Sequence, residues 1–514
     1  MKGIDLEPRE VIAPDSEPLP AAVVPSGVPP NRRLDHSLAD SLAWRAAANW
    51  SSQLVSWASF LLVVRLLSPA DFGIAAMAVI LWPYLRFLGE FGIAQTVITM
   101  RDLSEEQISQ LNSVGLCLGF VCFGLGAALA KPLALFFRTP ALAPVVIVTC
   151  LGLIPLGAKA GSEGLLAKDM RFRLLASFEA VLSVVSAIVT LVLAYKGMGY
   201  WALVLGNLAG YTSRSLLVLM FRPHRYAVPH LNSIRKPLTF GWHVLVSMVA
   251  WSAYERLDNV TAGRVLGQAA LGFYGLAWSL ANVPLEKLTS LVTTIVPSYL
   301  AAVQKEPAAL RRYLRTLTEA LALSTFPTTL GLALVARELV PFALGRKWEP
   351  MVPALEILAV YTTFRSVVAL LPKMLTAMGN PRFVMWNDLR ALVILPCAFY
   401  VGSRWGITGI AWGWVVAYPL VALPLYWKTF RMVGMNAAEY LRALRPAAEG
   451  VVVMSLGVLA LKWELRHSNL PTLLCLILEV VGGAILYAAT LLLLHRDRIM
   501  AFLQLAKSAR RAKA

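Results

Sequence analysis

The chain has 514 residues, of which 58% are hydrophobic and only 15% are charged, and its mean hydropathy is +0.65. Soluble globular proteins carry about 45–50% apolar and about 25% charged residues, so this composition excludes an ordinary soluble protein and indicates an integral membrane protein. The formal net charge of +18 is then expected to mark cytoplasmic loops and tails rather than a nucleic-acid-binding surface.

The first 39 residues are rich in proline, include acidic residues and lack an apolar signal core. A signal peptide would need such a core, and a segment of this composition buries too little apolar surface to fold. We therefore expect residues 1–39 to form a disordered cytoplasmic tail.

From residue 42 onward the sequence contains a series of apolar stretches, each long enough to cross a hydrocarbon core of roughly 30 Å. We predict an all-α polytopic membrane protein with about 14 transmembrane helices. The predicted spans are 42–64, 73–98, 108–130, 141–161, 174–195, 199–221, 239–262, 270–296, 315–336, 351–377, 383–403, 406–427, 446–463 and 470–494. The connecting loops are too short for an extramembrane catalytic or receptor domain, so we expect the protein to act within the bilayer.

The loops that share one side of the membrane with both termini are richer in Lys and Arg than the opposite loops. These basic segments are 222–236, 305–315, 428–445 and the tail 495–514. The positive-inside rule therefore predicts that both termini are cytoplasmic, and it favours contact of the basic tail with anionic lipid over nucleic acid.

Enzyme, metal and nucleotide motifs are absent from the sequence. The five cysteines lie in apolar stretches without a CxxC pair, the six histidines form no metal-spaced pair, and no GxxxxGK[ST] run occurs. We expect no cofactor, no metal and no enzymatic activity.

An internal repeat is suggested by two short matches. Arg65 to Gly73 aligns with Arg264 to Gly272 at an offset of 199, and glycines after residue 198 align with others after residue 405 at an offset of 207. Matches of this length also arise by chance in apolar sequence. We nevertheless predict two six-helix lobes, 40–222 and 238–430, around a central cavity, followed by two further helices at 440–494 and the tail 495–514.

Charged residues inside the predicted spans are costly, at about 2.5–3.5 kcal/mol each near the bilayer centre on insertion scales, so they normally face a cavity or one another. Arg86 with Glu90 and Lys159 with Glu163 are spaced four apart and share a helix face. Glu255 and Asp258 also share a face, where two like charges would compete for a proton.

Each of these charges also has a purely structural interpretation. Lys159, Arg365, Lys373, Asp388 and Arg390 lie near predicted span ends, where they could extend their charged groups to the interface. The Arg86 and Glu90 pair could simply neutralise itself. Against this, Arg45, Arg86, Arg256 and Lys287 come from the first two spans of the two predicted lobes, and a cationic cavity with apolar walls suits an anionic amphiphile.

Several motifs resemble those of a known family. The run from Arg65 to Ile74, the segment Phe91 to Ile98 and the run Arg101-Asp-Leu-Ser104 resemble the first-lobe signature of the Wzx-type polysaccharide transporters. These belong to the multidrug/oligosaccharidyl-lipid/polysaccharide superfamily. The segments that resemble the second-lobe signature are Asp258 to Gly267, Leu271 to Ala277 and Val296-Pro297. A third recurring element of the family is matched once in each lobe, by Gly199 to Val204 and by Gly406 to Ala411.

This resemblance implies a flippase of the bacterial inner membrane that moves an undecaprenyl-diphosphate-linked oligosaccharide from the cytoplasmic to the periplasmic leaflet, driven by a cation gradient. It implies that Arg45, Arg86, Arg256 and Lys287 bind the substrate anion, and that Glu90, Glu255, Asp258 and Glu286 are candidates for ion or proton coupling. The expected partners are membrane lipids and polysaccharide polymerase and co-polymerase proteins around a monomer.

Three other functions stay open. An assembly scaffold without transport is disfavoured by the number of charges within the predicted spans. A cation-coupled drug or small-molecule exporter of the same superfamily would have the same lobes. A membrane-embedded polymerase or ligase for lipid-linked sugars would be expected to carry a large periplasmic loop, which the sequence does not contain.

Overall fold

The computed structural model describes residues 57–496, except 101–102, 170, most of 231–255, 294–306 and 468–469. Within this part of the chain every regular element is a helix, which confirms the all-α prediction. The expected N-terminal tail, Arg45 and Glu255 lie outside the described residues.

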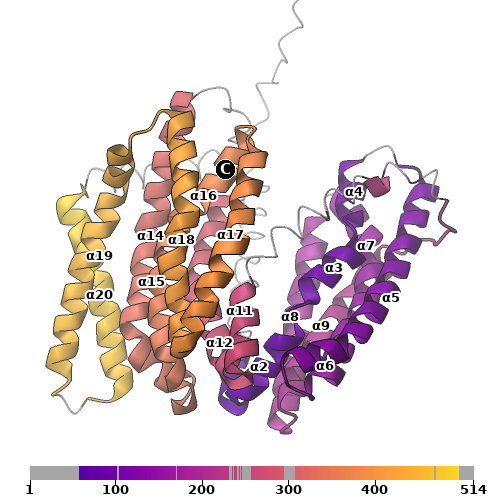
Figure 1. Ribbon diagram of the computed structural model, residues 1–514, viewed down its shortest axis with the longest axis horizontal. Coiled ribbons are helices and arrows are strands. Elements are labelled where there is room, and N and C mark those ends of the chain that lie inside the picture. The colour runs from indigo at the N-terminus through magenta and orange to yellow at the C-terminus, as the bar shows by residue number, and fades with distance from the viewer. Residues whose placement is uncertain are drawn as a thin grey trace, which may run out of the picture. The chain divides into compact units, whose positions relative to one another are not determined.

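The helices between residues 82 and 221 pack mainly on one another, with the closest partners α8 with α9 and α5 with α7 (Figure 1). They are α3 (Trp82–Glu90), α4 (Ile93–Thr99), α5 (Glu105–Phe136), α6 (Leu142–Leu151), α7 (Leu153–Lys168), α8 (Phe172–Tyr195) and α9 (Tyr200–Phe221).

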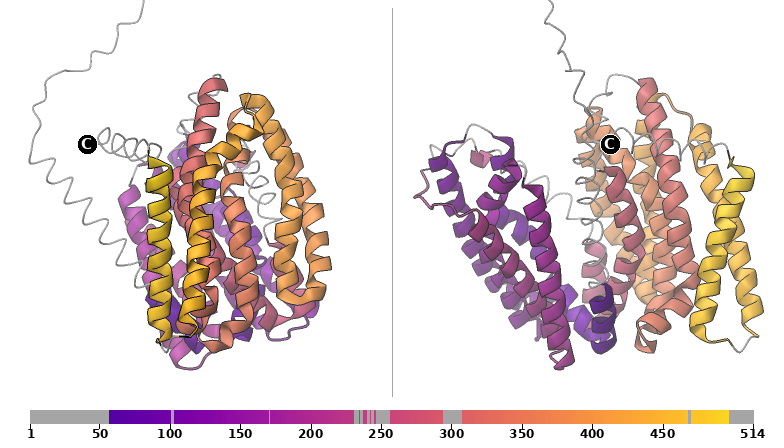
Figure 2. Two further views of the ribbon diagram at one scale, coloured as in Figure 1. Left: turned by 90° about the vertical axis from the view of Figure 1, so that its left-hand side faces the viewer. Right: turned by 180° about the vertical axis from the view of Figure 1, so that it is seen from behind.

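A second set of helices lies between residues 257 and 494. It comprises α11 (Leu257–Thr261), the π-helical turn η1 (Ala262–Leu266), α12 (Gln268–Thr293), α14 (Pro307–Ala343), η2 (Arg346–Met351), α15 (Val352–Val368), α16 (Leu370–Ala377), α17 (Pro381–Gly402), η3 (Ser403–Trp405), α18 (Gly406–Val433), α19 (Ala437–Leu465) and α20 (Thr472–Leu494). The last two pack against each other and against α14, as the views in Figure 2 also show.

The short helix α2 (Pro69–Ala78) begins at a Ser-Pro-Ala-Asp sequence, whose serine and aspartate form a capping box. The Ser68 hydroxyl accepts a hydrogen bond from the Asp71 backbone amide at 3.2 Å, and the Asp71 carboxylate accepts from the Ser68 amide at 2.9 Å. Pro69 occupies the first turn, where no intrahelical donor is lost. The second Asp71 oxygen accepts from the Tyr200 amide at 2.9 Å, which fixes α2 to the start of α9.

The helices α2 and α12 approach each other through two glycines. A Cβ on Gly73 would lie 1.7 Å from the Gln268 carbonyl oxygen, and one on Gly272 would lie 1.9 Å from the Pro69 carbonyl oxygen. Only glycine permits such a backbone approach. Both pairs, Gly73 with Gly272 and Pro69 with Gln268, are separated by the offset of 199 found in the sequence, so the two copies of the repeated motif contact each other reciprocally.

Ten helical stretches of the described chain are long and apolar enough to cross a membrane. In addition, the helical segment Trp57–Leu66 and α12 fall within predicted spans. The protein is a multi-pass membrane protein, while the number 14, the lobe boundaries and the orientation of the termini remain predictions.

Several predicted spans are not single helices. The spans 141–161 and 351–377 are each divided between two helices, α6 with α7 and α15 with α16. The span 73–98 comprises the end of α2, all of α3 and most of α4. There the chain turns at Phe91 and Gly92, which have φ angles of 44° and 62°, and Pro83 lies in the first turn of α3 after a break at residues 79–81. Left-handed residues and a proline near a helix start interrupt the helical hydrogen bonds, which a hydropathy window does not register.

Candidate functional site

A charged network joins α7, α8 and α9 inside the apolar helices. Glu163 accepts a hydrogen bond from the Lys159 ammonium group and another from Arg214 Nη2, at 2.6 Å. Arg214 Nε also lies 3.1 Å from a Glu179 carboxylate oxygen. Two cations and two carboxylates thus alternate through the network, so each charge has an opposite partner.

Lys159 is 1% exposed, which corrects the expectation that it reaches an interface from a helix end. Its helix packs closely on α5, because a Cβ on Gly157 would lie 2.3 Å from the Gly115 carbonyl oxygen. This close helix contact encloses the lysine, and its charge is satisfied by Glu163 instead of by water. The sequence spacing of four identified this pair, but not the Arg214 and Glu179 contributions.

Arg86 and Glu90 form the expected pair on α3, with Arg86 Nε 3.5 Å from a Glu90 carboxylate oxygen. The contact is loose. The Arg86 side chain is 42% exposed, and its Nε has no hydrogen-bond partner within the described residues. An arginine whose guanidinium is exposed and only loosely paired retains N–H donors for an additional anion.

Asp258 on α11 occupies a different kind of site, because its carboxylate is fully buried and is held by neutral donors. Oδ2 accepts hydrogen bonds from the Tyr274 hydroxyl at 2.9 Å and from Trp414 Nε1 at 3.2 Å. Oδ1 accepts from the Asn259 backbone and side-chain amides at 2.7 and 3.1 Å. These donors come from α11, α12 and α18, so the site exists only where the three helices meet.

Aromatic rings surround this carboxylate. Trp414 lies 5.1 Å from Trp278 and 4.9 Å from Tyr361, measured between ring centroids. The guanidinium of Arg365 lies 5.7 Å from the centre of the Trp278 ring and donates to Asn282 Oδ1 at 3.2 Å. Arg365 therefore points toward these interior rings, which corrects its assignment as a residue reaching the interface.

The remaining predicted site residues are more open. Arg256 is half-buried immediately before α11, and Glu286 and Lys287 are exposed on α12 after Pro284. Among the predicted site residues that the structure describes, Arg86 and Glu90 form an ion pair with each other. The sequence did not reveal the Tyr274 and Trp414 donors, although aromatic residues spaced four apart on α12 mark one helix face.

The end of the helical segment Trp57–Leu66 is docked on the end of α14 and on η2. Arg65 Nε donates to the Ala343 carbonyl at 2.9 Å, while the Lys347 ammonium donates to the carbonyls of Arg65 and Leu67, each at 2.6 Å. Trp348 Nε1 donates to the Val64 carbonyl at 3.0 Å. The Arg65 motif thus produces a backbone-mediated attachment as well as a helix start.

Comparisons with known proteins agree with these features. A family model described as "Polysaccharide biosynthesis protein" matches residues 62–353. The Escherichia coli lipopolysaccharide biosynthesis protein WzxC is 24% identical over 392 residues, covering 74% of this chain and 79% of WzxC. The succinoglycan biosynthesis transport protein ExoT of Rhizobium meliloti is 23% identical over 481 residues, covering 91% and 95% of the two chains.

Two solved structures have the same fold. The lipid II flippase MurJ in its inward closed conformation aligns with 88% of this chain and 99% of its own length, with a TM-score of 0.73 and 14% identity. An inward-facing multidrug resistance transporter of the MATE family aligns with 74% of this chain and 94% of its own length, with a TM-score of 0.56 and 15% identity.

Proposed function

Because this chain belongs to the polysaccharide biosynthesis family, the Wzx-type transporters of the multidrug/oligosaccharidyl-lipid/polysaccharide superfamily, we propose that it flips an undecaprenyl-diphosphate-linked oligosaccharide from the cytoplasmic to the periplasmic leaflet. As a member of a transporter family it is not an enzyme. The substrate, the direction and the energy source belong to the proposal.

The observation that carries the proposal is the state of Arg86. Its guanidinium lies on a membrane-embedded helix, is 42% exposed and is held only loosely by Glu90. Its role is to bind a diphosphate oxygen, which a guanidinium can do with two parallel hydrogen bonds. Arg45, Arg256 and Lys287 complete the proposed anion-binding set.

Asp258 is the proposed coupling residue. A carboxylate held by neutral donors can gain a proton or bind a cation without stranding a buried counter-charge, unlike Glu163. Glu90, Glu255 and Glu286 are the other candidates. A change in the charge of Asp258 would act on the contact of α11, α12 and α18, and therefore on α2, which packs on α12.

Alternating access is proposed to involve release of the segment 64–67, which precedes α2. Arg65, Lys347 and Trp348 donate hydrogen bonds to backbone carbonyls, and these bonds hold the segment against the end of α14 and η2. Hydrogen bonds to backbone carbonyls can break and re-form without a sequence-specific acceptor, which suits a contact that opens in each transport cycle.

The test is leaflet translocation in proteoliposomes that contain only this protein and a fluorescent polyprenyl-diphosphate oligosaccharide, with an imposed cation or proton gradient. We expect gradient-dependent movement that Arg86→Ala reduces and Arg86→Lys partly retains. Export of a small organic cation without movement of the lipid-linked sugar would instead establish the drug-exporter alternative, which the fold shared with the MATE transporter accommodates.

A further inference from the structure

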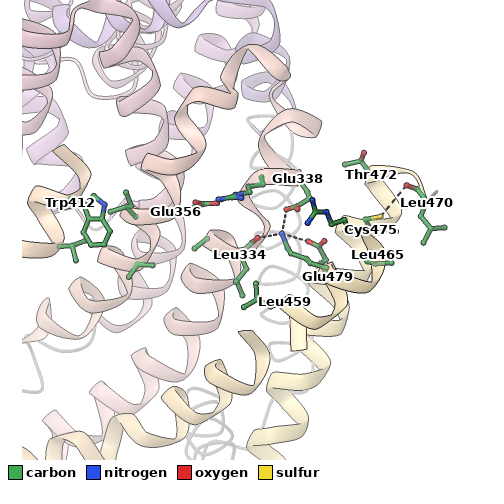
Figure 3. Close-up of a pocket in the computed structure, with 17 residues that line it drawn as sticks. Leu334, Glu338, Glu356, Trp412, Leu459, Leu465, Leu470, Thr472, Cys475 and Glu479 are labelled. Carbon is green, nitrogen blue, oxygen red and sulfur yellow. Dashed lines mark hydrogen bonds and ion pairs between the residues drawn. The ribbon is translucent and has the colours of Figure 1, made fainter. Parts of the chain in front are cut away.

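A cavity of about 870 Å³ lies among α14, α15, α18, α19 and α20. Its lining residues fall between Ala333 and Glu479, and neither Arg86 nor Asp258 is among them. Its lining combines aliphatic side chains with charged ones (Figure 3). This volume is in the range of small-molecule sites. The charged lining residues are Arg337, Glu338, Glu356, Lys462, Arg466 and Glu479.

Lys462 lies at the centre of the polar part. Its ammonium group donates to the Leu334 carbonyl at 2.6 Å and to Glu338 Oε2 at 2.6 Å, and it lies 3.5 Å from Glu479 Oε2. Figure 3 shows Glu338 and Glu479 converging on this group from different helices. The shorter contacts satisfy the lysine, so Glu479 is its weaker partner.

Glu479 is only weakly paired. Its side chain is 3% exposed, and its Oε2 lies 3.5 Å from the Lys462 ammonium without a hydrogen bond within the described part of the chain. A buried carboxylate with a single long contact of this kind favours a ligand that brings an N–H or O–H donor into the cavity.

The cavity also has an unused cation. Arg337 donates to Glu356 at 2.9 Å, whereas the side chain of Arg466 has no ion pair or hydrogen bond among the described residues. Arg466 is exposed at the end of α19. The cavity therefore offers an anion-binding group, Arg466, at the end of α19 and a weakly paired carboxylate, Glu479, on α20.

These groups lie near the end at which α19 and α20 are joined. Glu479 lies seven residues after the start of α20, which corresponds to about 10 Å along the helix axis and places it in the outer third of this helix. Trp412, 51% exposed, and the aliphatic residues Val415 and Leu459 complete the lining at its apolar side. Tryptophan at this level is typical of the membrane interface.

We propose that this cavity binds a zwitterionic phospholipid with a primary amine, namely phosphatidylethanolamine. The ammonium group donates to Glu479, the phosphate accepts from Arg466, and the upper acyl chains contact Val415 and Leu459. Phosphatidylcholine lacks an N–H donor for Glu479, and an anionic lipid without an amine leaves that carboxylate unsatisfied beside another negative charge.

The test is native mass spectrometry of the delipidated full-length protein, titrated separately with phosphatidylethanolamine, phosphatidylcholine and phosphatidylglycerol. We expect phosphatidylethanolamine to bind at least about tenfold more tightly than the other two, as one or two charge-assisted hydrogen bonds allow. Equal binding of phosphatidylcholine, or tighter binding of phosphatidylglycerol, would overturn the proposal.

Three variants make the assay specific to the cavity. Arg466→Gln, which changes an exposed side chain, and Glu479→Gln should each remove most of this preference. Arg445→Gln, which disrupts the exposed pair with Glu449 near the other end of α19, should leave it intact. Unchanged binding in Arg466→Gln would contradict the proposed phosphate contact even if Glu479→Gln failed to fold.

A competition arm separates this site from the transport pathway. Excess polyprenyl diphosphate should leave phosphatidylethanolamine bound, and displacement would show that the cavity belongs to the substrate pathway, contrary to the proposal. Because the assay measures binding without translocation, its result is independent of whether the protein proves to be a flippase.

Discussion

The network around Glu163 and the site around Asp258 both place carboxylates deep among apolar helices, but they stabilise them in opposite ways. Glu163 is held by the cations Lys159 and Arg214. Asp258 is held by the neutral donors of Tyr274, Trp414 and Asn259. A carboxylate with cationic partners must stay ionised to keep them satisfied, whereas one with neutral donors can change its charge at lower cost. We therefore propose a structural role for Glu163 and a switching role for Asp258.

Glu163→Gln should have the largest effect on stability. It leaves Lys159, 1% exposed, without a carboxylate and weakens the anchoring of Arg214, so we expect a loss of about 3–5 kcal/mol in unfolding free energy. The measurement is thermal unfolding in detergent together with the yield of monodisperse protein.

Two companion variants sharpen that result. Glu449→Gln removes the partner that Arg445 and His495 share near the surface, and it should lower thermal stability much less than Glu163→Gln. Adding Lys159→Met to Glu163→Gln should recover part of the loss, because the uncompensated charge is gone. If Glu163→Gln were no worse than Glu449→Gln, the network would not be structural.

Gly73→Ala tests the contact through which α2 meets α12. The added Cβ would lie 1.7 Å from the Gln268 carbonyl oxygen, and separating the helices should cost about 1–3 kcal/mol. The reciprocal variant Gly272→Ala should behave alike. Gly331→Ala on α14 is the control, since a Cβ there meets no atom within 4 Å. Equal thermal stability of Gly73→Ala and Gly331→Ala would contradict the close contact.

Asp258→Asn tests the proposed coupling role. Asparagine keeps one acceptor oxygen for the Tyr274 and Trp414 donors, but its NH2 group then faces the two Asn259 N–H donors. We therefore expect a loss of about 1–3 kcal/mol in unfolding free energy, with the protein still folded. Gradient-driven translocation in proteoliposomes should fall to the level seen without a gradient. Tyr274→Phe, which removes one donor but keeps the carboxylate, is the matched comparison and should retain coupling. Normal coupling in Asp258→Asn would exclude this residue as the switch.

A smaller effect is expected from pH at His224, which follows α9 outside the membrane spans. Ser162 Oγ donates to the Arg222 carbonyl at 2.6 Å, which leaves it to accept from Nδ1 of His224. Nε2 is buried without a partner among the described residues, and burial lowers the pKa of His224 below its ordinary value of 6.5.

The direction of the pH effect follows because the folded state favours the neutral form of His224. Above pH 6.5 both states are neutral, and as pH falls below 6.5 the unfolded chain takes up a proton that the folded chain resists, so stability decreases. The difference in melting temperature between pH 7.5 and pH 5.5 should therefore shrink in His224→Gln. An unchanged difference would show that other groups cause it.

The sequence by itself determined most of the helical course. Long apolar stretches such as α8, α9 and α20 were predicted closely, because hydrocarbon thickness fixes their length and composition. The spacing of four also predicted the pairs of Arg86 with Glu90 and Lys159 with Glu163, since residues four apart share a helix face. The offset of 199 aligned Gly73 with Gly272, the two glycines at which α2 and α12 meet.

Only the tertiary structure decided which charges are enclosed and by what. Tyr274 and Trp414 are 140 residues apart, yet both donate to Asp258. Lys159 and Arg365 were expected to reach an interface. Instead Lys159 is buried, and the partly buried Arg365 lies over the Trp278 ring. The packing of neighbouring helices, and not distance from a span end, determines what surrounds such a side chain. Helix formation in a membrane depends on local composition, but the partners of a buried charge come from distant segments that no local pattern specifies.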